Sequence, residues 1–163
     1  MKLIARIAAI VLAVCAAGSV LRAQDQVEHK AALTLALVKQ IAAAAEQQGC
    51  KVKCGGVIAI LDDSGELMYL QRVEGNQIGG SKLAIAKART AFLYRRSTKS
   101  FQDRIAKGDS FLLGFPEMLP AAGGIPLIIN GQLVGAIGVS GGPGGDEVVA
   151  QAGVDALAKI AAP

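Results

Sequence analysis

Residues 125–140, IPLIINGQLVGAIGVS, contain the strongest structural signal in the chain. Two runs rich in isoleucine, leucine and valine flank Asn130 and Gly131, and an Asn-Gly pair supplies the two positive φ angles that a tight hairpin turn needs. We therefore predict antiparallel strands at residues 125–129 and 132–140, joined by this turn. The glycine-rich residues that follow, 141–145, end the second strand.

A second hairpin is predicted nearer the start of the chain. Residues 56–61, GVIAIL, form a short β-branched run, and residues 66–73 alternate well enough for a strand. The intervening residues 62–65, DDSG, are typical of a turn. Two hairpins separated by helical segments indicate a mostly antiparallel α+β domain.

Helical periodicity surrounds these hairpins. Apolar residues recur at intervals of three and four through residues 25–48, which predicts a helix that ends at Gly49. Ser81 is placed to cap a second helix that runs to Tyr94. The pattern thus puts helices before and after the first hairpin.

The remaining segments are expected to form two further helices and a loop. A short helix is expected after Ser100, whereas residues 107–118 mix glycine, proline and apolar side chains without a period and are expected to form a partly buried loop. Asp146 is placed to cap a last helix with one apolar side. The chain contains no internal repeat.

Residues 1–23 have the three parts of a secretory signal peptide. A basic start is followed by an apolar run at residues 7–20 and by the small residue Ala23. Because this run of about 14 residues is shorter than the roughly 20 that a spanning helix needs, no membrane anchor is expected. We predict a single mature domain at residues 24–163 in the periplasm or outside the cell.

Removal of that peptide changes the balance of charges and cysteines. It takes three of the 17 basic residues and none of the 13 acidic ones, so the formal net charge of +4 falls to about +1. A nucleic-acid partner is therefore not expected. Cys50 and Cys54 stay, in a compartment that permits disulfides, and a bridge between them requires a turn at residues 51–53. Bridged and free cysteines both remain open.

Two residues stand out as candidates for binding. His29 is the only histidine, which excludes hydrolytic triads and histidine-rich zinc sites. Its side chain is therefore either exposed and solvated or a metal ligand. The most specific form of the second alternative is axial ligation of a haem iron. Lys87 is surrounded by alanines small enough to leave its ammonium group in a cleft. It belongs to a basic stripe that either pairs with carboxylates or is simply solvated: Lys82, Lys87, Arg89, Arg95, Arg96 and Lys99.

Other features carry weaker signals. The glycine-rich residues 138–145 lie where phosphate-binding loops lie, but they match no phosphate-binding motif, and a tight strand-to-helix connection explains them better. Four side chains could flank an iron porphyrin or fill the core: Met68, Tyr69, Tyr94 and Met118.

Several segments together resemble the GlcG/HbpS family. Residues 84–91, AIAKARTA, resemble its A-x-x-K-A-x-T-A helix. Residues 123–126, GGIP, resemble its GG-x-P entry to the second hairpin, and residues 135–141, GAIGVSG, resemble its G-x-I-G-V-S-G strand. Residues 57–65 resemble its first hairpin, and Asp146 with Glu147 begins an alanine-rich ending similar to that of the family. The resemblance covers nearly all of the mature chain, in order.

This resemblance implies a fold and a ligand. The fold would be a profilin-like α/β/α sandwich, in which helices flank a central antiparallel sheet of about five strands. The ligand would be haem or a related tetrapyrrole, as in secreted haem-binding members and in the PduO C-terminal-like domain fused to corrinoid adenosyltransferases. The resemblance also implies a homo-oligomer.

We therefore expect an exported haem-binding protein with a scavenging or sensing role. Lys87 or Arg89 would meet the propionates, and His29 or an oxygen side chain would lie near iron. The expected cofactor-binding residues are His29, Lys87, Arg89, Thr90, Gly124 and Ser140, with His29 also the expected metal ligand and no catalytic residue assigned.

Two alternatives remain open at this stage. One is a small-molecule or haem-degrading enzyme that uses Lys87, Thr90 or the pair Asp146 and Glu147 in the same cleft. The other is a non-catalytic accessory subunit of a periplasmic system.

Overall fold

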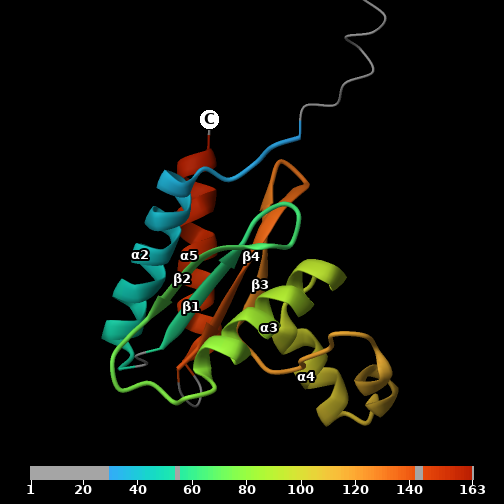
Figure 1. The fold of residues 1–163 in the computed structure, drawn as a ribbon. Helices are drawn as coiled ribbons and strands as arrows, with labels where there is room; N and C mark the ends of the chain where they lie inside the picture. Colours follow the sequence, from blue (N-terminus) through green and yellow to red (C-terminus); the bar gives the residue numbers. More distant parts are fainter. Residues whose placement is uncertain (1–29, 54–55, 142–144, 163) are drawn as a thin grey trace, which may run out of the picture. The chain divides into compact units, whose positions relative to one another are not determined.

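A computed structural model describes residues 30–53, 56–141 and 145–162 of the chain (Figure 1). The chain divides into two units, Met1–Lys30 and Ala31–Pro163, and the described helices and strands all lie in the second. The predicted export signal, His29 and Cys54 lie outside the described residues, so the signal, the histidine ligand and the cysteine bridge stay predictions.

Four antiparallel strands form one sheet, in the order β2-β1-β4-β3. The strands are β1 (Val57–Leu61), β2 (Leu67–Arg72), β3 (Gly124–Ile129) and β4 (Gln132–Ser140). Both predicted hairpins are confirmed, and the turn of the second has the positive φ angles expected of Asn-Gly, 49° at Asn130 and 79° at Gly131. The described residues contain four strands, where about five were expected.

The two hairpins meet through the central strands β1 and β4. Val57 lies opposite Ser140, and Leu61 lies opposite Ala136. Because both strands have neighbours on each side and helices above and below, every residue of β1 and the last seven residues of β4 are buried.

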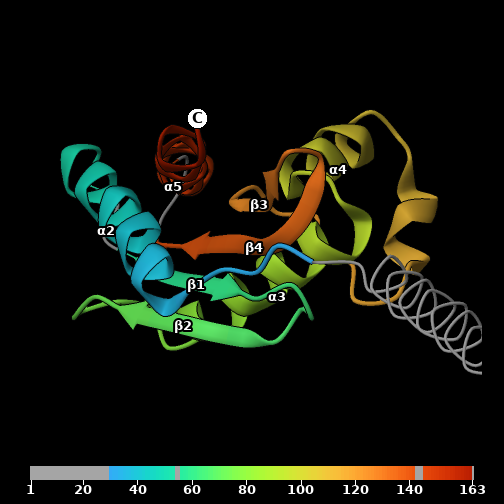
Figure 2. The same ribbon diagram turned by 90° about the horizontal axis from the view of Figure 1, so that it is seen from above.

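Helices cover both faces of this sheet. Figure 2 shows α2 (Leu35–Lys51) and α5 (Asp146–Ala161) on one side and α3 (Gly80–Tyr94) on the other. Alternate residues of β1 point to opposite faces of the sheet and pack in separate hydrophobic cores. Ile58 and Ile60 pack with α2 and α5, whereas Ala59 packs against α3. The α/β/α sandwich expected from the sequence is confirmed.

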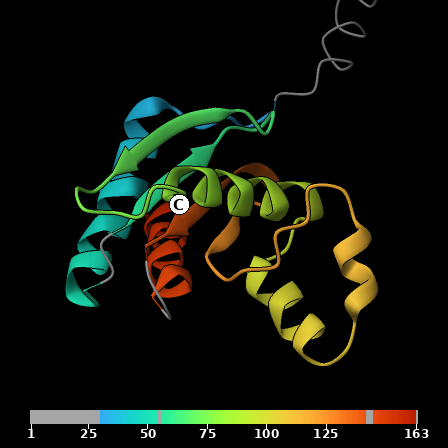
Figure 3. The same cartoon turned by 60° about the horizontal axis from the view of Figure 1, so that its bottom comes forward.

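Two shorter helices follow α3. They are α4 (Thr98–Ala106), which contacts α3, and the 3₁₀ helix η1 (Ser110–Gly114), which contacts α4 (Figure 3). The predicted short helix starts earlier than Ser100, because the Ser97 side chain accepts the Lys99 N–H at 3.1 Å and caps it. The predicted loop at residues 107–118 contains η1.

The first helix begins later than the periodicity predicts. The described residues 30–34 are not helical, and α2 starts at Leu35 because Thr34 has extended backbone angles and its hydroxyl accepts the Leu37 N–H at 3.2 Å. Its other end passes Gly49 and continues to Lys51. Leu33, just ahead of the cap, is buried in the core.

The two predicted side-chain caps of the later helices are wrong. Gly79, not Ser81, occupies the N-cap of α3, and Gly145, not Asp146, occupies that of α5; neither cap has a side-chain hydrogen bond. The Asp146 carboxylate instead accepts the Gly141 N–H at 2.8 Å. Asp146 therefore binds the backbone ahead of α5 and does not cap the helix.

Two glycines let α3 lie directly against the sheet. A Cβ atom at Gly138 would meet the carbonyl oxygen of Ala84 and would lie 2.7 Å from the backbone nitrogen of Ala88. A Cβ atom at Gly124 would meet the carbonyl oxygen of Lys87 and would lie 2.7 Å from the Thr98 methyl group. Backbone thus packs on backbone at both strands, which only a missing side chain permits.

We predict that Gly138→Ala lowers the free energy of unfolding by about 1–3 kcal/mol, because the added methyl group forces α3 away from β4. The measurement is chemical denaturation followed by circular dichroism. Gly79→Ala is the matched control, since Gly79 has a φ of −76° and open space around the site. Equal stabilities of the two variants would contradict the close approach.

Candidate functional site

Different residues of α3 line two separate clefts. Leu83 and Lys87 contribute to a polar cleft of about 630 Å³. Ile85 and Arg89, on another side of the helix, contribute to a mainly apolar cleft of about 430 Å³. The helix that packs against the sheet therefore provides a wall of both clefts.

The polar cleft is built around a buried ion pair. The Lys87 ammonium group lies 2.6 Å from a carboxylate oxygen of Asp146 and donates to the Val139 carbonyl oxygen at 3.0 Å, with only 6% of its side chain exposed. Two of its three protons are thus used. The pair fixes the start of α5 to α3 and to the end of β4.

A second carboxylate in the same cleft is also held by the protein. Glu147 accepts the Ser97 hydroxyl at 2.7 Å and the Gly123 N–H at 2.7 Å. Ser140, buried at the end of β4, lies 3.5 Å from the Gln77 amide nitrogen. The complete lining is Gln77, Leu83, Lys87, Lys99, Gln102, Ala121, Ala122, Ser140, Gly141, Asp146 and Glu147.

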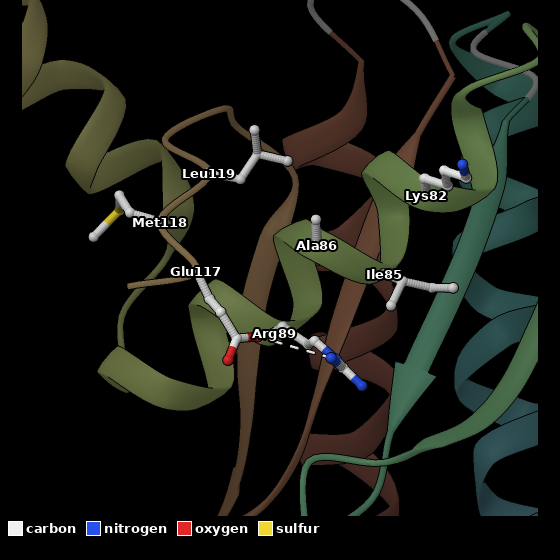
Figure 4. Close-up of a pocket in the computed structure, with 7 residues that line it drawn as sticks. All are labelled: Lys82, Ile85, Ala86, Arg89, Glu117, Met118 and Leu119. Carbon is white, nitrogen blue, oxygen red and sulfur yellow. Dashed lines mark ion pairs between the residues drawn. The ribbon is translucent and has the colours of Figure 1, made fainter. Parts of the chain in front are cut away.

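The apolar cleft lies between the outer side of α3 and the loop that precedes β3 (Figure 4). Four side chains of α3 form one wall, and three consecutive loop residues form the other: Lys82, Ile85, Ala86 and Arg89, then Glu117, Met118 and Leu119. Two basic groups and one acidic group thus flank an apolar surface.

Arg89 is weakly held at the edge of this cleft. Its guanidinium group lies 3.8 Å from a Glu117 carboxylate oxygen and 3.9 Å from one of Glu66, and 44% of its side chain is exposed. Both distances exceed hydrogen-bond length, so these are loose surface ion pairs. Arg89 is therefore held less tightly than Lys87.

The structure separates the residues that the sequence grouped as one site. Lys87 and Ser140 line the polar cleft, and Arg89 lines the apolar one. Thr90 is fully buried, and Gly124 packs beneath α3. These two residues line neither of the two clefts.

Sequence reasoning missed one wall of the apolar cleft. The loop residues 117–119 follow no period, and nothing in their sequence marks them as neighbours of α3. The helical side of the wall was detectable, because Lys82, Ile85, Ala86 and Arg89 are spaced by three and four residues and must share a side of the helix.

The described part of the chain contains neither a cluster of metal-binding side chains nor a helix that could span a membrane. In residues 30–53, 56–141 and 145–162, no three histidine, cysteine or acidic side chains gather as a metal site would require. Across the same residues, no helix has both the length and the apolar character to span a membrane.

Together these features define a class of protein: an α/β/α sandwich of two antiparallel hairpins, with a buried lysine on the helix that crosses one face and a cleft on that helix's outer side. Residues 33–155 match the family described as "Haem degrading protein HbpS-like". The chain belongs to this family.

Relatives and solved structures agree with this assignment. Protein GlcG of Escherichia coli is 34% identical over 111 residues, which are 68% of this chain and 83% of GlcG. A double mutant of HbpS from Streptomyces reticuli has a TM-score of 0.70 at 30% identity and is matched over 80% of this chain and 90% of its own. A structure described as a PduOC:heme complex has a TM-score of 0.68 at 26% identity, over 77% of this chain and 95% of its own.

We predict that Lys87→Ala lowers the free energy of unfolding by about 3 kcal/mol, because it leaves the Asp146 carboxylate partly buried without its cation. Urea denaturation measures the loss. Lys99→Ala is the control, since Lys99 pairs with Asp103 one helical turn away and both side chains are 49% exposed. That change should cost about 0.5 kcal/mol or less. A similar loss in both variants would contradict a structural role for the buried pair.

Proposed function

We propose that this protein is an exported haem-binding protein with a scavenging or sensing role, and that haem binds in the apolar cleft. The observation that carries the proposal is the composition of that cleft, an apolar surface flanked by two basic residues, Lys82 and Arg89, and by one acidic residue, Glu117. A haem has the complementary pattern, with a flat apolar ring and two propionate carboxylates at one edge.

The dimensions and chemistry of the cleft suit such a ligand. Its volume of about 430 Å³ is in the range of small-molecule sites. Ile85, Ala86 and Leu119 would contact the ring, and Ala86 leaves room for it because its side chain is a single methyl group. Bound haem would supply a redox-active iron and a strong Soret absorption.

Lys87 and Arg89, two residues of the basic stripe, differ in how readily they could bind propionates. Lys87 already contacts Asp146 at 2.6 Å in the polar cleft, and breaking that contact would leave a largely buried carboxylate without its lysine. Arg89 has only loose carboxylate partners and a planar guanidinium that can bind a carboxylate through two parallel hydrogen bonds. We therefore assign propionate binding to Arg89, with Lys82 as the second cation.

The relatives support the same ligand. One structure with this fold is described as a heme complex, and the description of the family to which the chain belongs is "Haem degrading protein HbpS-like". Neither description depends on the geometry of the cleft described above, so the two lines of support are independent.

We predict that hemin added to the purified protein gives a saturable shift of the Soret band at micromolar concentration. Ala86→Leu should weaken binding at least about tenfold, because the larger side chain occupies the space of the ring. Ala36→Leu, which makes the same change at an exposed position of α2 across the sheet, should bind as the unmodified protein does.

The charge requirement is tested in the same titration. Arg89→Ala should weaken hemin binding about threefold to tenfold, as loss of a partly exposed charged contact does. Lys159→Ala removes the same charge on α5 and should have no effect. Absence of a saturable shift with the unmodified protein would overturn the proposed function, and equal binding by all variants would overturn the assigned cleft.

Export and assembly complete the proposed role. We expect cleavage after Ala23, as the signal-peptide pattern predicts, and a homo-oligomer, as the family resemblance implies. Intact-mass analysis of protein from a bacterial periplasm should show a chain that begins at Gln24, and light scattering should show more than one copy per particle. A full-length chain retained in the cytoplasm would contradict export, and a monomer with and without hemin would contradict assembly.

A further inference from the structure

The loop wall of the apolar cleft is fastened to α3 by one buried hydroxyl group. The Thr90 hydroxyl donates to the Glu117 carbonyl oxygen at 2.7 Å, with the Ala86 carbonyl oxygen also 3.0 Å away. The Thr90 hydroxyl oxygen also accepts the Leu119 N–H at 2.9 Å. One side chain thus holds the backbone on both sides of Met118.

The loop needs such a fastening because its backbone conformation is unfavourable. Glu117 has a φ of 52°, in the left-handed region that residues other than glycine rarely adopt. Tyr94, one turn further along α3, adds a second tie by donating to the Pro116 carbonyl oxygen at 2.6 Å. Both ties start on α3, which also forms the opposite wall of the cleft.

We infer that Thr90 is a positioning residue for the haem cleft, acting through the loop and not by contact with the ligand, an inference that rests on the proposed function. Its side chain is fully buried and does not line the cleft, whereas the residues that it holds, Glu117 and Leu119, do. The width of the cleft is therefore set by a group that haem never touches.

The hydroxyl group, and not the size of the side chain, carries this role. Valine has nearly the same shape as threonine but would leave the Leu119 N–H and the Glu117 carbonyl without their partner. Serine keeps both hydrogen bonds and loses only a methyl group. Thr90→Val and Thr90→Ser are thus a matched pair that separates bonding from packing.

The first measurement needs no haem. Hydrogen exchange of the Leu119 amide, in the protein without ligand, should be at least about tenfold faster in Thr90→Val than in the unmodified protein and nearly unchanged in Thr90→Ser. Unchanged exchange in Thr90→Val would overturn the inference. If Thr90→Val does not fold, Thr90→Ala decides instead, because it also removes the hydroxyl group and adds no atoms; unchanged exchange of the Leu119 amide in that variant would again overturn the inference.

The second measurement is the hemin titration of the same variants. Thr90→Val should bind hemin about tenfold more weakly, and Thr90→Ser should bind within about twofold of the unmodified protein. Faster exchange with unchanged hemin affinity would overturn the positioning role while leaving the proposed function intact. Failure of the unmodified protein to bind hemin would instead overturn the proposed function, so the two failures are distinguishable.

Discussion

The contact of α3 with the sheet at Gly124 and Gly138 is the constraint on which the rest of the structure depends. Since both strands lack a side chain there, the helix backbone lies against them, and its side chains are carried into fixed positions beside the sheet. That placement puts Lys87 within reach of the end of β4 and of α5. It also brings Thr90 beneath the loop before β3. Both clefts therefore depend on how closely one helix approaches two glycines.

Two basic residues only two positions apart on α3 have different roles as a result. A helix turns about 100° per residue, so side chains two apart point in nearly opposite directions. Lys87 is buried, tightly paired and part of the framework, whereas Arg89 is half exposed and loosely paired at the edge of the apolar cleft. Under the proposed function, stability and haem binding would then depend on different residues of the same short motif.

The sequence predicted the fold better than the site, for physical reasons. Asn130 and Gly131 set a hairpin locally, and such signals do not depend on distant residues. The start of α2 was predicted too early because alanine-rich periodicity continues past Thr34, where a hydroxyl cap decides the boundary. Asp146 was expected to cap its own helix, but a partner 59 residues away, Lys87, competes for its carboxylate. The cleft wall at residues 117–119 depends on a tertiary hydrogen bond that no local pattern encodes.

The central pairing of β1 with β4 also determines when the sheet can form during folding. Val57 finds its partner only at Ser140, about eighty residues later in the chain, so this sheet depends on long-range contacts that are slow to form. During synthesis, the first hairpin must wait for almost the whole remaining chain before its inner edge is covered. For a precursor that crosses a membrane as proposed, this delay favours export, because the chain reaches the translocation machinery before it can complete its sheet.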